Sequence, residues 1–340
     1  MTGRKAWRLS ACGLLLLCAS EACLQLLGFG HPPLVTTASP AQYEPVPNQS
    51  TWRVWPMSDS LIAHVRTNRY GMRSESIDAK KRANTCRIYF LGDSITWGTT
   101  QVDQNQLFTE ILHRELPNRL HEPVEVMNGS ISGWAIANEF AFLKEHGALE
   151  ADRIILVLND GDPTQPLAPA PVDDAIPSLA HHPTFALQEL LDRGVRPKLI
   201  QLAQKAGIDW SATSTKDPGL DINPDLMVLR ANLLLLGDME AFVRSQGSKM
   251  SILYIPFQGL RDDNSAYARA QIGRRAIERW AESNGVPFVD LGPSMSRFPV
   301  DQVLLRDHAH FNVAGHRAIA AQIEAHWSDL TTDRHSEVVE

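Results

Sequence analysis

Short apolar segments, each followed by a polar turn, recur through most of the chain. The segment 153–158 reads RIILVL and is apolar throughout, which is typical of a parallel strand that is covered on both faces. Between such segments, apolar residues recur at helical spacing. This alternation predicts an α/β protein with a doubly wound, mostly parallel five-stranded sheet flanked by helices. The predicted strands cover residues 88–91, 124–127, 153–158, 250–255 and 286–291.

Helical spacing is clearest after the first predicted strand. There, Leu107, Phe108, Ile111, Leu112 and Leu116 recur at intervals that place them on one face of a helix. Later stretches show the same pattern, and the last one follows a polar loop that contains two histidines. The predicted helices cover residues 104–116, 135–145, 229–245, 266–284 and 313–327.

Some segments break the alternation. Residues 163–225 contain repeated prolines and predict an inserted excursion, with helical pieces near 185–194 and 198–206. An insertion of this length is either a functional lid or a variable surface excursion. Residues 30–60 are rich in Pro, Ser, Thr and Gln, which predicts a linker or an extended surface segment. A turn with apolar flanks at 68–71 predicts a small hairpin that leads into the first strand.

These patterns divide the chain into four parts. The α/β unit is the largest part, and the insertion lies within it. The parts are an N-terminal membrane anchor or signal segment (1–30), a linker and small lead-in (31–86), the α/β domain (87–330, with the insertion at 163–225) and a polar tail (331–340).

The N-terminus combines basic residues with a long apolar run. Arg4, Lys5 and Arg8 precede residues 9–29, a run of roughly 20 residues that is long enough to span a bilayer as a helix. The basic residues indicate insertion with the N-terminus inside. Glu21 interrupts the run and would be costly deep in lipid. The run is an uncleaved anchor, a cleaved signal peptide or a buried core helix, and the first two place the body outside the cytoplasm, on the periplasmic face.

Composition narrows the possible partners. The chain has 340 residues and a net charge of −7 without long charged runs, so a nucleic-acid partner is not indicated. Cys12, Cys18 and Cys23 lie in the N-terminal apolar run, and Cys86 is alone in the body. One cysteine cannot build an internal disulfide framework.

Four polar stretches fall at strand ends or just before a predicted helix, so we expect them at one edge of the sheet. The first contains a serine whose hydroxyl becomes a nucleophile only when a base removes its proton. Each stretch alone also fits an ordinary cap or turn. Together they supply a nucleophile, oxyanion donors, a base and an orienting carboxylate. They are Gly92-Asp93-Ser94, the turn ending at Gly133, the turn beginning at Asn159, and Asp307-x-x-His310.

The spacing of these residues allows each of them a separate role in catalysis. Asp307 can hold one imidazole nitrogen of His310 while the other faces Ser94. The backbone N–H groups of Ser94 and Gly133 and the side-chain amide of Asn159 can point at one oxygen.

These stretches resemble the sequence blocks of the SGNH (GDSL-type) hydrolase superfamily. FLGDSITWG resembles the first block, with Ser94 as nucleophile, and NGSISGWA resembles the second, with Gly133 as oxyanion donor. DHAHFNVAGH resembles the last block, with Asp307 and His310 completing the triad. The third block differs, because a glycine-rich turn ending in Asn-Asp is replaced by LVLNDGD, in which Asn159 is the natural match. The resemblance covers roughly residues 87–327 without the insertion and implies a serine ester hydrolase, for which we predict no metal and no other cofactor.

Other residues compete for these roles. His308 would point away from the site in an extended loop, and His316 falls inside the last predicted helix, where a packing or capping role is expected. Together with Asp307 and His310 they are also zinc-type ligands, but no matching spacing supports a metal site.

Location and resemblance together predict a membrane-anchored or secreted esterase. The predicted substrate is an O-acetyl ester on an envelope or exported carbohydrate, or another small-molecule ester. Two alternatives stay open: an O-acetyltransferase that uses the same triad, and a non-catalytic glycan-binding or assembly protein on the same fold. A lipase or thioesterase, with the insertion forming an apolar channel, is a weaker alternative.

Overall fold

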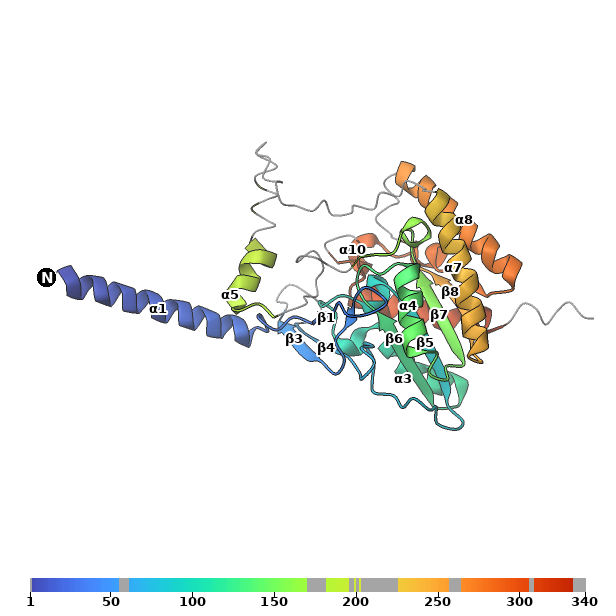
Figure 1. The fold of residues 1–340 in the computed structure, drawn as a ribbon, viewed down its shortest axis with the longest axis horizontal. Helices are drawn as coiled ribbons and strands as arrows, with labels where there is room; N and C mark the ends of the chain where they lie inside the picture. Colours follow the sequence, from blue (N-terminus) through green and yellow to red (C-terminus); the bar gives the residue numbers. More distant parts are fainter. Residues whose placement is uncertain are drawn as a thin grey trace, which may run out of the picture.

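A five-stranded parallel sheet forms the centre of the protein (Figure 1). The strand order is β6-β5-β7-β8-β9, and every neighbouring pair is parallel, which confirms the predicted doubly wound α/β fold. The strands are β5 (Cys86–Gly92), β6 (Val124–Ser130), β7 (Arg153–Leu158), β8 (Lys249–Tyr254) and β9 (Phe288–Asp290). The computed structural model describes residues 2–54, 61–169, 182–195, 199, 202, 226–256, 264–305 and 309–332, except the side chains of 2–10, 192–194 and 264–269.

Helices cover both faces of the sheet. In β5, Tyr89 and Leu91 belong to the core on one face, whereas Ile88 and Phe90 belong to the core on the other. The first face is covered by α4 (Ile136–His146), α7 (Leu226–Ser245) and α8 (Asn264–Asn284), and the second by α3 (Phe108–Leu120), α11 (Val313–Ala325) and α12 (Trp327–Thr331). Short helices in the connections are α2 (Ser94–Trp97), η1 (Gln104–Gln106), η2 (Asp162–Thr164), α9 (Gly292–Met295) and α10 (Val300–Val303).

The strand register brings three of the predicted polar stretches to one edge. Gly92, the last residue of β5, pairs with Ser130 at the end of β6 and with Val157 near the end of β7. The turns after these strands therefore lie next to one another at the carboxyl edge of the sheet, where open parallel sheets bind their ligands.

The predicted helix at 104–116 is divided in the structure. A 3₁₀ turn at Gln104–Gln106 is followed by Leu107, whose backbone is extended (φ −66°, ψ 145°) and whose side chain is fully buried. The helix α3 then begins at Phe108. A similar break at His326 separates α12 from α11, so the last predicted helix is also two elements.

Residues 31–54 differ from the predicted linker. They form β1 (Val35–Thr36), which pairs with β2 (Glu44–Pro45), and β3 (Ser50–Val54). The Tyr43 side chain is fully buried in the core next to α4, and its hydroxyl donates a hydrogen bond to the Ser132 carbonyl oxygen (2.9 Å). A few buried side chains with satisfied polar groups are enough to fix a segment whose overall composition is polar.

The lead-in also differs in detail from the prediction. The turn at 68–71 is present, with the Gly71 N–H donating to the Asn68 carbonyl oxygen (3.0 Å) and Gly71 at φ 74°. The paired strands are β3 and β4 (Ile62–Arg66), so the hairpin precedes the turn and does not enclose it.

The N-terminal helix α1 (Thr2–Leu26) projects away from the body in Figure 1. Among the residues that the structure describes, no helix has both the length and the apolarity needed to cross a bilayer. The described part of the insertion contains α5 (Ala186–Glu189) and a π-helix, η3 (Leu190–Val195), at the place of the first predicted helical piece. Most of the second predicted piece, 198–206, lies outside the described residues.

Candidate active site

Ser94 is the first residue of α2, directly after the turn that ends β5. The Asp93 carboxylate accepts a hydrogen bond from the Ile95 N–H (2.9 Å) and caps this short helix. Gly98 ends the helix in the left-handed conformation (φ 81°), and its N–H donates to the Ser94 carbonyl oxygen (2.9 Å). The Ser94 side chain is held on a capped helical turn at the sheet edge and is 8% exposed.

The glycine before this turn is required by space. A Cβ at Gly92 would lie 2.4 Å from Thr96 Oγ1 and 3.1 Å from the Val157 carbonyl oxygen. Only glycine therefore lets β5 turn directly into α2 and bring the serine to the edge of the sheet.

Asn159 lies beside the nucleophile turn, as the prediction requires. Its Nδ2 donates a hydrogen bond to Asp93 Oδ2 (2.9 Å). Its Oδ1 accepts from the Gly161 N–H (2.7 Å), and its own N–H donates to Asp162 Oδ2 (2.7 Å). The third turn, although it departs from the glycine-rich pattern, thus fixes the Asn159 amide next to the residue that precedes Ser94.

Gly133 presents an exposed backbone at the same edge. Its φ of 87° lies in the left-handed region, which favours glycine. Its carbonyl oxygen accepts a hydrogen bond from Gln165 Nε2 (3.2 Å), and Tyr43 holds the preceding carbonyl. Among the hydrogen bonds of the described residues, none is donated by the Gly133 N–H, which leaves that donor available to a ligand.

His310 lies half-buried on the loop before α11. Its carbonyl oxygen accepts a hydrogen bond from the Leu305 N–H (2.7 Å), which fixes the backbone of the loop. Its imidazole acts electrostatically on Asp93 and on His316, so it lies within electrostatic reach of the residue directly before Ser94. Burial raises the pKa of Asp93, while the Ile95 N–H and then the His310 imidazole lower it.

The other candidate residues of the last block divide into two groups. Asp307 and His308 lie outside the described residues, so the predicted orienting acid, the alternative base and the zinc site stay predictions. His316 is fully buried, accepts a hydrogen bond at Nδ1 from the Phe108 N–H (3.3 Å) and stacks on the Phe108 ring. Burial lowers the pKa of His316 to about 3. His316 is therefore a packing group, as predicted, and not the base.

Two further carboxyl groups, to which the sequence patterns assigned no role, are buried in this part of the protein. Asp162 and Glu139 are both fully buried, and among the described residues no donor reaches either oxygen of Glu139. Burial, followed by the repulsion of neighbouring carboxylates, raises the pKa of Glu139 and of Asp162 well above their ordinary values. Both acids therefore keep their protons to a higher pH than exposed carboxyl groups do, and Asp162 Oδ2 accepts the hydrogen bond from the Asn159 N–H.

The raised pKa of Glu139 predicts a pH-dependent stability. Between the ordinary glutamate pKa and the higher folded-state pKa, the folded chain binds a proton that the unfolded chain releases. The free energy of unfolding then falls as pH rises through this window, by at most about 1.4 kcal/mol per pH unit for one proton. Replacing Glu139 with glutamine removes this titration, so urea unfolding of E139Q should lose less stability than the wild type between pH 5 and 8. The exposed Glu282→Gln serves as a control and should follow the wild type.

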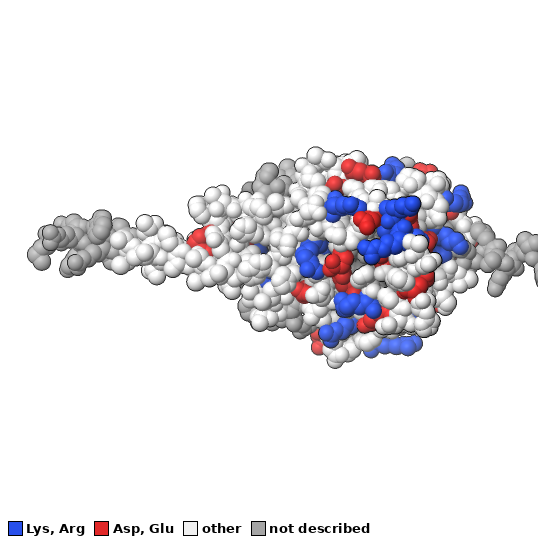
Figure 2. All heavy atoms as spheres, turned by 90° about the horizontal axis from the view of Figure 1, so that it is seen from below, with Lys and Arg blue, Asp and Glu red and all other residues white. Residues whose placement is uncertain are grey.

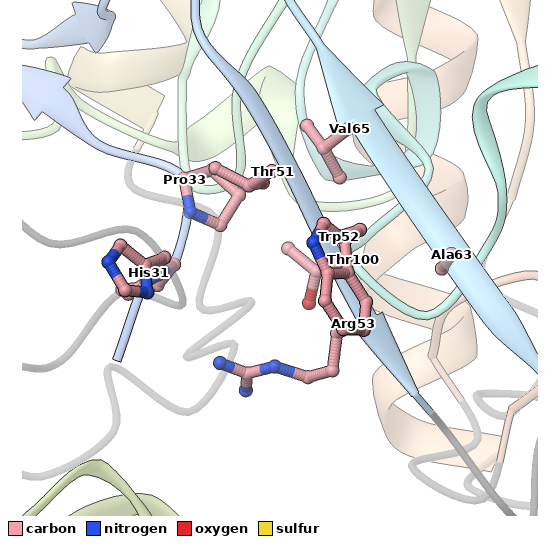
Figure 3. A pocket seen from close by; sticks show the side chains of 9 residues that line it. His31, Pro33, Thr51, Trp52, Arg53, Ala63, Val65 and Thr100 are labelled. Carbon is pink, nitrogen blue, oxygen red and sulfur yellow. The ribbon is translucent and has the colours of Figure 1, made fainter. Parts of the chain in front are cut away.

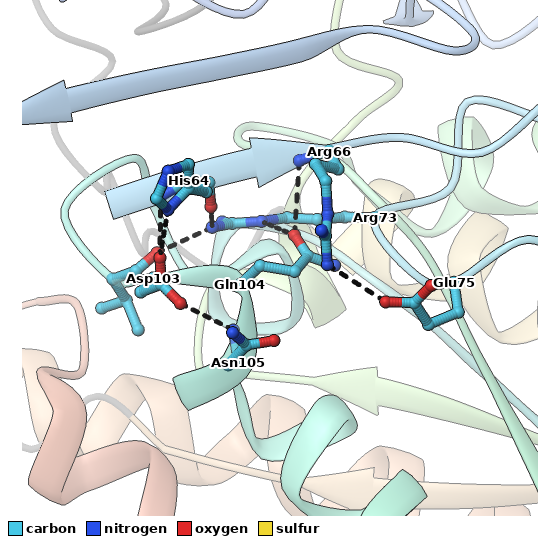
Figure 4. A network of polar contacts seen from close by, with 8 residues as sticks. His64, Arg66, Arg73, Glu75, Asp103, Gln104 and Asn105 are labelled. Carbon is cyan, nitrogen blue, oxygen red and sulfur yellow. Dashed lines mark hydrogen bonds and ion pairs between the residues drawn. The ribbon is translucent and has the colours of Figure 1, made fainter. Parts of the chain in front are cut away.

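The loop that follows α2 is held by a buried arginine from the lead-in segment (Figure 4). Arg73 is fully buried, and its guanidinium donates hydrogen bonds to the carbonyl oxygens of Trp97 (2.6 Å), Thr99 (2.5 Å) and Val102 (2.7 Å). Its Nε also donates to the Gln104 side chain (3.2 Å). Burial lowers the pKa of Arg73 to about 9, so the guanidinium stays charged at neutral pH. The lead-in segment therefore positions the nucleophile loop, and sequence patterns gave no signal for this role.

A small pocket lies between the N-terminal segment and the β3–β4 hairpin (Figure 3). Thr100 connects it to the loop that Arg73 holds, but Ser94 is not among its lining residues. The lining residues are His31, Pro32, Pro33, Thr51, Trp52, Arg53, Ala63, Val65 and Thr100.

Comparisons place this site among known proteins. Residues 90–318, more than half of the chain, match the GDSL-like Lipase/Acylhydrolase family, and the match contains Ser94, Gly133, Asn159 and His310. No curated protein matches the chain.

Among solved structures, the chain is similar to LAE5, an α/β hydrolase from the metagenome of Lake Arreo, Spain (18% identity, 73% of this chain and 97% of that chain, TM-score 0.45). It is also similar to the acetylxylan esterase Axe2 from Geobacillus stearothermophilus (15% identity, 72% and 94%, TM-score 0.42). A third similar structure is TesA (15% identity, 72% and 98%, TM-score 0.43).

Proposed function

Because the chain belongs to the GDSL-like lipase/acylhydrolase family and is a carboxylic ester hydrolase, we propose that it works through Ser94 as nucleophile, His310 as base and Asp307 as orienting acid. The observation that carries this proposal is the hydrogen bond between Asn159 and Asp93 beside Ser94, with His310 in electrostatic reach of the same carboxylate. This arrangement joins residues from three distant parts of the chain at one edge of the sheet.

The proposed reaction begins with attack of Ser94 Oγ on the ester carbonyl carbon, while the hydroxyl proton passes to His310. The resulting oxyanion accepts hydrogen bonds from the Gly133 N–H and the second Nδ2 hydrogen of Asn159. His310 returns the proton to the leaving alcohol, and an acyl-serine forms. Water then attacks the acyl carbon, giving its proton to His310, which returns it to Ser94 as the carboxylic acid leaves.

Asn159 supplies a direct test of the oxyanion site. N159A should lower kcat for 1-naphthyl acetate by about 10²–10³-fold, because one pre-oriented donor is lost. Its KM should change little, since the donor acts mainly on charge that develops in the transition state. Asn105→Ala, on the 3₁₀ turn η1, is the control and should keep wild-type kcat. An N159A enzyme with unchanged kcat would remove Asn159 from the mechanism.

We further propose that the acyl group is small and the alcohol is a carbohydrate, so that the substrate is an O-acetyl ester on an envelope or exported glycan. Several polar groups lie at this edge of the sheet: the Gly133 backbone is exposed, Gln165 donates to its carbonyl oxygen, and Asn159 is hydrogen-bonded to Asp93. These polar groups suit an acetyl group on a polar polymer better than a long apolar chain.

The substrate proposal is tested by comparing esters of increasing chain length with an acetylated glycan. We expect the wild type to release acetate from the glycan and to prefer acetyl over dodecanoyl esters of p-nitrophenol, with S94A inactive on all of them. Activity confined to long acyl chains would reject the carbohydrate substrate. Transfer of acetyl from p-nitrophenyl acetate to a glycan hydroxyl, in place of hydrolysis, would identify an O-acetyltransferase.

We also propose that α1 tethers the enzyme to a membrane and leaves the body outside the cytoplasm. Support comes from the basic residues Arg4, Lys5 and Arg8 before the apolar run and from the projection of α1 away from the body. Alkaline phosphatase fused after residue 332 and expressed in bacteria should be active and remain with the membrane fraction. An inactive fusion would reject the extracytoplasmic location.

A further inference from the structure

A group of metal-ligand side chains lies where β2 meets the C-terminal end of α4, outside the residues of the candidate active site. It consists of Glu44, Glu145 and His146, and one ligand atom from each lies within 4.8 Å of the others. His146 Nε2 is 3.3 Å from Glu44 Oε2. Ser39 Oγ lies between the carboxylates, 3.0 Å from Glu44 Oε2 and 3.3 Å from Glu145 Oε2. One nitrogen and two carboxylate oxygens therefore converge on one small volume.

The separation of these atoms suits a small tetrahedral ion. Zn²⁺ lies about 2.0–2.2 Å from histidine nitrogen and carboxylate oxygen, so two ligand atoms of a tetrahedral site are about 3.3 Å apart. The distance between Glu44 Oε2 and His146 Nε2 has this value. A charge-assisted hydrogen bond between the same groups is shorter, at about 2.7–2.9 Å. The geometry therefore fits two ligands of one ion better than a directly bonded pair.

Neighbouring groups hold these ligands in place. The His146 ring packs against Phe142, with ring centres 4.3 Å apart, and meets Tyr70 edge to face at 6.1 Å. The Ala41 N–H donates a hydrogen bond to Ser39 Oγ (3.1 Å), which fixes the hydroxyl that contacts both carboxylates. Partners of this kind raise metal affinity, because they orient the ligands before the ion binds.

The cluster carries an excess of negative charge. Glu44 is buried, and its imidazole partner is charged only when protonated. Among the described residues, neither Glu44 nor Glu145 forms an ion pair with Lys or Arg, and Lys144 lies over the Phe140 ring instead (4.5 Å). On the face of the body in Figure 2, by contrast, acidic side chains lie among Lys and Arg. A divalent cation supplies the positive charge that the cluster lacks.

We propose that Glu44, Glu145 and His146 bind one Zn²⁺ ion, with water as the fourth ligand. The imidazole selects against Mg²⁺ and Ca²⁺, which prefer sites made of oxygen ligands. The role of the ion is structural: it joins β2 to the end of α4, while Tyr43, next to Glu44, holds the Ser132 carbonyl oxygen before α4 begins. Glu44 is 102 positions before His146, so no short ligand motif in the sequence marks the site.

The test titrates Zn²⁺ into metal-free, full-length protein and follows binding by isothermal titration calorimetry. All four native cysteines are replaced with alanine, so that thiolates cannot bind the ion. We expect one equivalent to bind with a Kd below about 10 μM. Saturating zinc should raise the melting temperature by about 3–6 °C, because the ion binds the folded chain. Mg²⁺ at the same concentration should produce neither effect.

Variants of the ligands locate the ion. Glu145 is exposed, so E145Q should fold as the parent protein does and bind zinc at least about tenfold more weakly. H146Q should lose both the stoichiometric binding and the rise in melting temperature. The exposed Glu282→Gln and His326→Gln, whose imidazole pairs with Asp329, are the matched controls and should bind zinc as the parent does. Unchanged affinity in both E145Q and H146Q would overturn the inference.

Zinc X-ray absorption of the one-to-one complex identifies the ligand types directly. We expect one imidazole and otherwise oxygen ligands, at about 2.0–2.2 Å. A spectrum with more than one imidazole would place the ion elsewhere and overturn the inference, as would the absence of binding in the titration. S94A should bind zinc with unchanged affinity, so zinc binding and ester hydrolysis are tested separately.

Discussion

Replacement of Ser94 with alanine is expected to lower kcat/KM for 1-naphthyl acetate by at least about 10⁴-fold. The hydroxyl is the proposed nucleophile, and the oxyanion donors alone give only a small part of the rate of such enzymes. Alanine fits the first turn of a helix, and the cap of α2 comes from Asp93 and not from Ser94. The variant should therefore fold as the wild type does.

Ser296→Ala is the matched control for this experiment. Ser296 is exposed, and within the described part of the chain its hydroxyl donates to the Pro293 carbonyl oxygen of the same turn. It should keep wild-type kcat/KM and melting temperature. The control preparation excludes a contaminating esterase. If the S94A enzyme then retained the wild-type rate, the nucleophile would have to be a different residue.

Replacement of Arg73 with methionine should have the largest effect on stability, lowering the free energy of unfolding by about 3–5 kcal/mol. Methionine fills much of the volume but leaves the carbonyl oxygens of Trp97, Thr99 and Val102 buried without donors, and each such loss costs about 1–3 kcal/mol. R73K keeps the charge with fewer donors and should lose roughly half as much. Urea unfolding at pH 7 measures both values.

The same variants test whether Arg73 positions the nucleophile. At a temperature where R73K is fully folded, kcat should fall about tenfold while KM changes little, because the loop after α2 is displaced. Arg244→Met is the control, since Arg244 is exposed on α7 and, among the described residues, forms a surface ion pair with Glu240. If R73K lost stability but kept wild-type kcat, Arg73 would have a structural role alone.

The sheet and much of the site follow from the sequence because they depend on local patterns. Apolar runs with polar ends marked all five strands, and the strand order places Ser94, Gly133 and Asn159 at neighbouring turns. The least regular block, LVLNDGD, still places Asn159 against Asp93, because Asp162 and Gly161 hold the turn in place of further glycines.

Other features depend on distant contacts that a linear pattern does not contain. Tyr43 is buried because it meets Ser132 from the second block, although its own segment is polar. Arg73 is 21 positions before Ser94 and reaches the carbonyls of the loop after it only in the folded chain. Glu139 did leave a signal: it shares a helix face with Ile136 and Leu143, where an acid is unexpected.

The most direct test of the central claim is the rate at which a fluorophosphonate modifies the enzyme, followed by identification of the modified peptide by mass spectrometry. We predict one phosphonylated residue, Ser94, and a labelling rate at least about 10³-fold lower in His310→Ala than in the wild type. Modification of a different residue, or equal labelling rates in the wild type and H310A, would contradict activation of Ser94 by His310.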